Sequence, residues 1–88
     1  MTVLSYTIKS EEGLHARPAT DLVRLATTFK GTIEIEYRIR VNMKSMLMVL
    51  SLGIYQGETF TIYMNGEDEH LMKEKIEEVL LKEGLIWR

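Results

Sequence analysis

The residues best suited to chemistry in this 88-residue chain are His15 and Arg17, within the stretch Gly13-Leu14-His15-Ala16-Arg17-Pro18-Ala19-Thr20. Proline is tolerated in the first turn of a helix, where its missing N–H has no carbonyl to bind, so Pro18 predicts a helix that begins beside His15. The first amides of such a helix lack partners, and next to a guanidinium they favour an anion such as phosphate. Because a neutral imidazole can act as a nucleophile near pH 7, these residues suit capture of a phosphoryl group on His15.

A histidine at a helix start can equally be a solvated loop residue without any reaction, and its neighbours decide between the two interpretations. The stretch from Gly13 to Thr20 resembles the active-site segment of the HPr family, the histidine-containing phosphocarriers of the bacterial sugar phosphotransferase system. The segment Asn42-Met43-Lys44-Ser45, followed by Met46 to Gly53, is similar to the regulatory-serine segment of that family. The resemblance extends over essentially the whole chain.

The resemblance implies a cytoplasmic phosphocarrier in which His15 accepts a phosphoryl group from enzyme I and passes it to an enzyme IIA component. Arg17 would stabilise the transferring oxygens, and the chain would be a relay rather than an enzyme with its own turnover. Ser45 is implied as a regulatory site for an HPr kinase/phosphorylase, with a catabolite-control transcription factor as a further partner. The residues implied in partner binding flank the histidine and form the next short helix: Ala16, Thr20, Met46, Leu47 and Leu50.

Several of these assignments have alternatives. The chain could be a regulatory paralogue that acts through phosphorylated Ser45, or a small enzyme that uses His15 as a general base. Ser45 could serve only as a helix N-cap. The apolar run from Met46 to Leu50 could be a docking surface or a half-buried core helix. Met48 stands where many members of the family have glycine, and it either fills extra core or enlarges the docking surface.

Composition excludes several classes of function. The net charge of −2 argues against a nucleic-acid partner. The chain has no cysteine, which removes disulfides and thiol chemistry. The longest apolar run is too short to cross a bilayer, so we expect no membrane insertion, and no secretory signal is apparent. His15 and His70 lack metal-ligand spacing and the glycines form no nucleotide-binding loop, so neither a metal nor a cofactor is expected.

The periodicity of apolar residues predicts seven elements in one domain, residues 1–88. A first strand runs from Thr2 to Lys9, and a helix from Ala16 ends at Gly31, with Asp21 early enough to favour the helix dipole. The remaining elements are a strand at 32–37, a strand through Val41 and Met43, a helix at 46–52 capped by Ser45, a strand at 59–64, and a last helix that carries Met72, Ile76, Val79 and Leu80 and stops at Gly84.

The element order β-α-β-β-α-β-α predicts an α+β fold, with helices on one face of a mainly antiparallel four-stranded sheet and solvent on the other. The resemblance implies the same open-faced β-sandwich. The turn at residues 38–40 departs from the family, which usually has a polar, glycine-bearing turn about one residue longer. No residue in this turn takes a positive φ easily.

Overall fold

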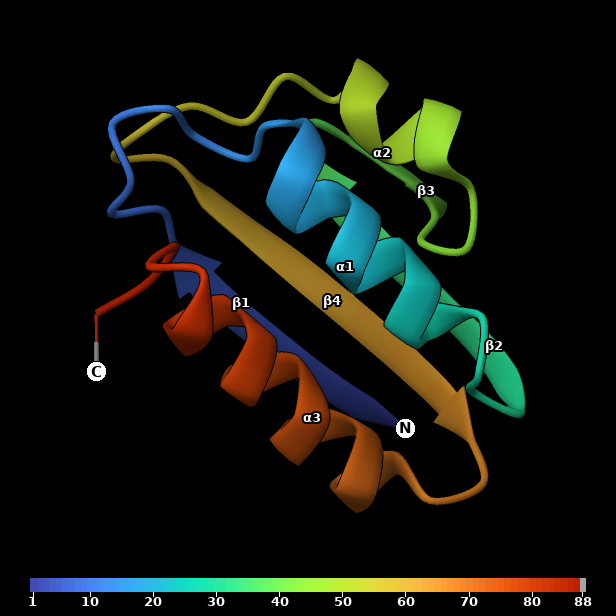
Figure 1. Ribbon diagram of the computed structural model, residues 1–88. Helices are drawn as coiled ribbons and strands as arrows, with labels where there is room; N and C mark the ends of the chain where they lie inside the picture. The colour runs from blue at the N-terminus through green and yellow to red at the C-terminus, as the bar shows by residue number, and fades with distance from the viewer. Residues whose placement is uncertain (88) are drawn as a thin grey trace.

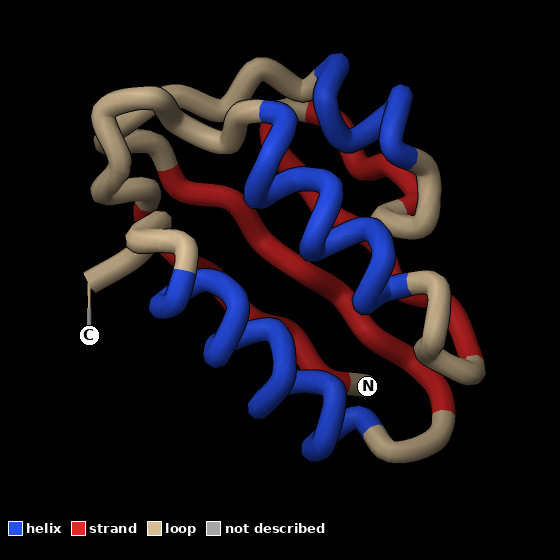
Figure 2. The backbone as a smooth tube through the Cα atoms, in the orientation of Figure 1, coloured by secondary structure: helices blue, strands red, loops and turns tan. Residues whose placement is uncertain are grey.

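The computed structural model describes residues 1–87 as one four-stranded sheet and three helices. The elements in chain order are β1 (Thr2–Thr7), α1 (Ala16–Ala26), β2 (Gly31–Tyr37), β3 (Ile39–Asn42), α2 (Met46–Ser51), β4 (Thr59–Gly66) and α3 (Glu69–Lys82). The strands lie in the order β1-β4-β2-β3, and every neighbouring pair is antiparallel. All three helices cover the same face of the sheet, with α1 between α2 and α3 (Figure 1, Figure 2). The predicted α+β open-faced sandwich is confirmed, and its sheet is antiparallel throughout.

The core lies between the sheet and the helices, because alternate strand residues point to the helical side. Leu4, Ile35 and Phe60 of the sheet pack with Leu22 of α1 and Ile76 of α3, all of them buried. The opposite face carries hydroxyl pairs across β1 and β4, Ser5 with Thr61 and Thr7 with Thr59. This pattern confirms the predicted solvated face, since side chains on a strand alternate between the two sides of a sheet.

Helix α1 ends earlier than the sequence predicts. It stops at Ala26, because the hydroxyl groups of Thr27 and Thr28 donate to carbonyls of the preceding turn, at 2.7 Å each. Such side-chain bonds to the backbone compete with helix continuation. Gly31 does not end the helix; it opens β2 instead, where a Cβ at this position would lie 2.3 Å from the carbonyl oxygen of Asn65. Glycine is therefore required by close strand contact rather than by helix termination.

The first strand is also shorter than predicted. It ends at Thr7, after which the Ile8 amide donates to the Glu58 carbonyl and the Lys9 amide donates to the Leu85 carbonyl. The chain thus leaves the sheet edge two residues early and heads for the loop that carries His15.

The connection between β2 and β3 is a single residue. Tyr37 pairs with Ile39, and Arg38 between them has a φ of +70°. This conformation is unfavourable for an L-residue, because it brings the Cβ close to the following carbonyl oxygen. The Arg38 guanidinium lies over the Tyr37 ring, 5.1 Å from its centroid, which gives the tip a cation–π contact.

Among the residues that the structure describes, no helix has the length and apolar character needed to cross a membrane.

Candidate functional site

The loop before α1 is fastened to the segment after α2. The Gly13 amide donates to the Ser10 carbonyl at 3.0 Å, and the Leu14 amide donates to the Ile54 carbonyl at 2.9 Å. Gly13 has a φ of +67°, and a Cβ there would meet the Ile54 carbonyl oxygen at 2.4 Å. Only glycine fits this turn without displacement, so the turn sets the backbone position of the next residues, Leu14 and His15.

His15 is the N-cap residue of α1, with an extended backbone at φ −90°, and its carbonyl accepts from the Ala19 amide at 3.1 Å. Its imidazole makes no capping hydrogen bond and is 35% exposed. In the described part of the chain, the amides of Ala16 and Arg17 donate no hydrogen bond. The predicted helix start is confirmed, and it presents an accessible imidazole beside two free N–H groups at the positive end of a helix.

Two charged side chains accompany the imidazole. The Glu12 carboxylate lies 3.9 Å from Nε2 of His15, and Arg17 lies on the first turn of α1 with its side chain 84% exposed. The Arg17 Nε is 3.8 Å from Oε1 of Glu83, the C-cap residue of α3. Arg17 is thus an exposed cation next to the helix amides, and its ion-pair partner comes from the far end of the sequence.

Glu83 also meets Asp21 of α1. Hydrogen bonding with the Asp21 carboxyl group is the largest cause that raises the pKa of Glu83; burial and the negative charge of Asp21 raise it further, while the charges of Arg17 and Lys82 oppose the shift. Asp21 lies beyond the first turn of α1, and that turn contains no acidic residue. The prediction that Asp21 is early enough in the helix to favour its dipole was therefore wrong. Sequence reasoning missed Glu83, because only the packing of α1 against α3 brings it to Arg17.

The start of α2 is held by two side chains. The Ser45 hydroxyl accepts from the Met48 amide at 3.3 Å, which confirms the predicted N-cap. The Lys44 Nζ donates to the carbonyls of Phe29 and Gly31, at 2.9 and 3.1 Å. Lys44 therefore fixes the start of α2 to the turn after α1.

Exposed apolar side chains gather on α2, and we call Met46, Leu47, Met48 and Leu50 the α2 patch. Leu47 is 79% exposed and Met48 41%, whereas Val49 is buried in the core. Met46 is half-buried, with its sulfur 3.9 Å from the Thr20 hydroxyl, which itself donates to the Ala16 carbonyl. The α2 patch therefore adjoins the first turns of α1, and Met48 lies on the surface rather than in the core. Its role in docking stays a prediction.

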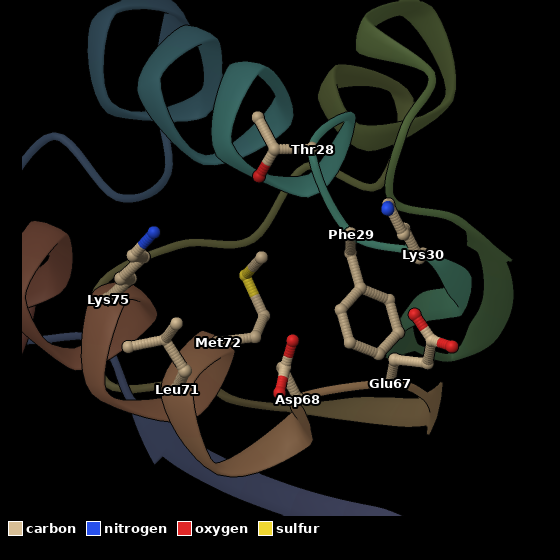
Figure 3. A pocket seen from close by; sticks show the side chains of 8 residues that line it. All are labelled: Thr28, Phe29, Lys30, Glu67, Asp68, Leu71, Met72 and Lys75. Carbon is tan, nitrogen blue, oxygen red and sulfur yellow. The ribbon is translucent and has the colours of Figure 1, made fainter.

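No second site competes with this one in the described residues. The hollow in Figure 3 lies between the end of α1 and the start of α3, at the other end of α1 from His15, and its lining holds no nucleophile–base pair. His70 is exposed, with its Nε2 3.2 Å from Glu74 Oε1. Residues 1–87 include no group of three or more His, Asp or Glu side chains that could hold a metal ion.

Comparison with known proteins agrees with this geometry. Residues 4–82 match the family model described as the PTS HPr component phosphorylation site. The histidine-containing phosphocarrier protein of a mycoplasma is similar over 99% of this chain and 100% of its own, with 31% identity and a TM-score of 0.93. The phosphocarrier protein HPr of Bacillus anthracis has 32% identity over 89% of this chain and 94% of its own, with a TM-score of 0.78. The Bacillus subtilis catabolite repression protein Crh, described as a dimer with a swapping domain, has 29% identity over 100% of both chains and a TM-score of 0.68.

Proposed function

The chain belongs to the HPr family of phosphocarrier proteins, and from this premise we propose that its His15 receives a phosphoryl group from enzyme I and passes it to an enzyme IIA component. The reaction moves one phosphoryl group from a phosphohistidine-type donor to an imidazole nitrogen and then onward, without net hydrolysis. The chain is a carrier in the cytoplasm rather than a catalyst with turnover of its own.

The single observation that carries this proposal is the position of His15 at the start of α1. Its imidazole is accessible, and the amides of Ala16 and Arg17 next to it are free to bind phosphate oxygens. Donors that stand ready before the reaction stabilise developing charge without reorganisation. The exposed guanidinium of Arg17 adds a mobile positive charge on the same turn.

The α2 patch supports the choice of partners. Enzyme I and an enzyme IIA component must each cover His15 during transfer, and an apolar surface of flexible methionine and leucine side chains suits several partners in turn. Ala16 and Thr20 would complete this surface on α1, beside Met46.

A second candidate function is favoured by Ser45 and by the similarity to Crh. In that case a kinase would phosphorylate Ser45 at the N-terminus of α2, and the modified chain would bind a catabolite-control transcription factor. Phosphate is electrostatically favourable at a helix start. The two functions are compatible, since His15 and Ser45 lie on different helices.

A two-step relay tests the proposal. Enzyme I and labelled phosphoenolpyruvate should load the chain, and addition of an enzyme IIA component to the isolated product should move the label to that protein. A chain that enzyme I leaves unlabelled, but an HPr kinase labels on Ser45, would be a regulatory paralogue instead. His15→Gln should abolish loading by enzyme I and leave labelling of Ser45 unchanged.

A further inference from the structure

The segment after α2 ends in a turn that a glutamate side chain closes. In this turn, residues 55–58, the Glu58 amide donates to the Tyr55 carbonyl at 3.2 Å. The Glu58 carboxylate closes the turn a second time, because the Tyr55 amide donates to its Oε1 at 2.8 Å. Gly57 has the positive φ, +85°, that a type II turn requires at its third residue. The shape of the 55–58 turn therefore depends on one side chain as well as on the backbone.

The sheet holds the same carboxylate from the other side. Oε2 of Glu58 accepts a hydrogen bond from the hydroxyl of Tyr37, the last residue of β2, whose ring packs against the core. The hydrogen bonds from Tyr37 and Tyr55 lower the pKa of Glu58, and the charge of Arg38 lowers it too, against the effect of burial. Glu58 is thus ionised at neutral pH, which strengthens both bonds. It connects the 55–58 turn to the end of a core strand.

The 55–58 turn and the residue before it contact both ends of the loop that carries His15. At the start of that loop, the Ile8 amide donates to the Glu58 carbonyl at 2.9 Å. At its other end, the Leu14 amide donates to the carbonyl of Ile54, also at 2.9 Å. Ile54 is buried and directly precedes the turn. The backbone next to His15 is therefore fastened to a segment whose own position depends on Glu58.

We propose that Glu58 is a positioning residue for His15. The carboxylate holds the Tyr55 amide, and this contact keeps the neighbouring Ile54 carbonyl where the loop of His15 is fastened. Without the carboxylate the turn is free to move, and the imidazole then faces the incoming phosphoryl group for a smaller fraction of the time. A misplacement of about 1 Å can cost about 100-fold in rate. The inference rests on the proposed function, because it concerns phosphoryl transfer to His15.

A second tyrosine–glutamate pair on the sheet provides the matched control. The Tyr63 hydroxyl donates to Oε1 of Glu36 at 2.6 Å, and in the described part of the chain Glu36 accepts no hydrogen bond from the loops near His15. Glu36→Ala and Glu58→Ala therefore remove the same group from the same kind of pair. Glu58→Gln is the conservative variant, because its amide oxygen can still accept from the Tyr55 amide.

The first experiment needs no partner protein and follows hydrogen exchange of the Leu14 amide by NMR. In Glu58→Ala this amide should exchange about five- to tenfold faster, the effect expected from the loss of about one hydrogen bond. Glu58→Gln and Glu36→Ala should stay close to the unmodified chain. Equal exchange of the Leu14 amide in Glu58→Ala and Glu36→Ala would overturn the proposal.

The second experiment measures the kinetics of transfer from enzyme I to each variant, below the melting transition of all of them. Glu58→Ala should lower kcat about ten- to 100-fold and leave KM unchanged, because the α2 patch is intact. Glu58→Gln should restore most of the rate, and Glu36→Ala should transfer normally. An unchanged kcat for Glu58→Ala, or a change in KM alone, would exclude the positioning role.

Two further outcomes remain informative. If Glu58→Ala does not fold, Tyr37→Phe removes only the hydroxyl that holds the carboxylate, and Tyr63→Phe is its control. Tyr37→Phe should change Leu14 exchange and kcat in the same direction by a smaller factor, and values equal to those of Tyr63→Phe would overturn the proposal. If enzyme I labels neither the variants nor the unmodified chain, the proposed function fails, whereas hydrogen exchange still shows whether Glu58 holds the loop.

Discussion

At the scale of single residues, His15 and Arg17 differ in how firmly the fold holds them. The backbone around His15 is fixed by hydrogen bonds to Ser10, Ile54 and Ala19. The Arg17 side chain is exposed, and its Nε lies 3.8 Å from Oε1 of Glu83. The imidazole is thus presented by a rigid loop, and the guanidinium can follow the phosphoryl group as it arrives and leaves.

Removal of the Arg17 guanidinium should slow phosphoryl transfer without unfolding the domain. A charge-assisted contact contributes about 1.5–3 kcal/mol, so Arg17→Ala should reduce the transfer rate by about one to two powers of ten. Rapid-quench kinetics with enzyme I would measure this. Arg24→Ala, an exposed arginine two turns further along α1, serves as the control and should transfer at the normal rate. Equal rates for both variants would assign the phosphate to the helix amides alone.

The turn at Gly13 allows a sharper test of how the loop is built. Gly57 also has a positive φ, of +85°, but a Cβ there would meet nothing within 4 Å. Gly57→Ala should therefore lower the free energy of unfolding only by the cost of a positive φ at an L-residue, about 1–2 kcal/mol. Gly13→Ala adds a clash with the Ile54 carbonyl, so its free energy of unfolding should fall further. The clash should also shift the amide NMR signals of the residues around His15. Urea denaturation measures the two losses of stability, and NMR spectra measure the shifts around His15. Equal losses for Gly13→Ala and Gly57→Ala would contradict the proposed rigidity of the loop.

At the scale of elements, α2 combines a polar start with an apolar surface. Ser45 caps the helix, Val49 anchors it in the core, and Leu47 and Met48 remain exposed. The Ser45 cap and the terminating Gly53 could be predicted from sequence, because each is a local property of the chain, whereas the helix ends at Ser51, one residue before its predicted end. Whether Met48 is exposed or buried depends on which face of α2 packs against α1 and the sheet, so only the structure could show that Met48 is exposed.

A negative charge at Ser45 should weaken docking and preserve the fold. Aspartate is as good an N-cap as serine, and an anion at a helix start contributes about 0.3–1 kcal/mol. Ser45→Asp should therefore melt no lower than the unmodified chain, yet bind enzyme I less tightly, most clearly at low salt. Ser45→Ala separates the two effects, because it loses the cap, about 1 kcal/mol, and adds no charge. Calorimetry with titration of enzyme I measures both; unchanged affinity of Ser45→Asp would exclude α2 from the docking surface.

Other features of the elements escaped sequence analysis for physical reasons. The early end of α1 depends on the hydroxyls of Thr27 and Thr28, which bind backbone carbonyls instead of solvent. The one-residue turn at Arg38 requires a conformation that arginine rarely adopts. Periodicity cannot reveal either, because both arise where local preferences are overruled by a hydrogen bond or by strand register.

At the scale of the whole molecule, contacts between distant segments decide what the site contains. The loop of His15 was predictable because its residues are consecutive, and the sheet order agrees with the family resemblance. The meeting of Arg17, Asp21 and Glu83 was not, because it needs the first and last helices to pack side by side. Long-range pairs of this kind leave no periodic signal in a single sequence.

The whole-molecule contacts also predict a pH dependence of stability. Glu69 accepts hydrogen bonds from the Thr2 hydroxyl and the Gly66 amide, and these bonds lower the pKa of Glu69. Since the folded state then releases this proton more readily than the unfolded chain, the stabilisation is present above the ordinary carboxyl pKa and is lost as pH falls through the lowered one.

Glu69→Gln should therefore be less stable than the unmodified chain at about pH 7, and the difference should narrow at about pH 3. Urea midpoints at both conditions measure the two differences. Glu67→Gln serves as the control, because it removes the same charge at an exposed neighbouring position outside β4 and α3. The stability difference between this variant and the unmodified chain should not narrow between the two pH values. If the stability difference between Glu69→Gln and the unmodified chain is the same at both pH values, the hydrogen bonds to the Glu69 carboxylate are not its cause.

The most direct test of the central claim is the identity of the phosphorylated side chain after incubation with enzyme I and phosphoenolpyruvate. We expect one phosphoryl group per chain, labile in acid and stable in base, and fragmentation mass spectrometry should place it on His15. His70→Ala should accept the same amount, because His70 lies on the exposed side of α3, and His15→Ala should accept none. Phosphate that remains in His15→Ala, or that maps to His70, would contradict the assignment of His15 as the phosphoryl acceptor.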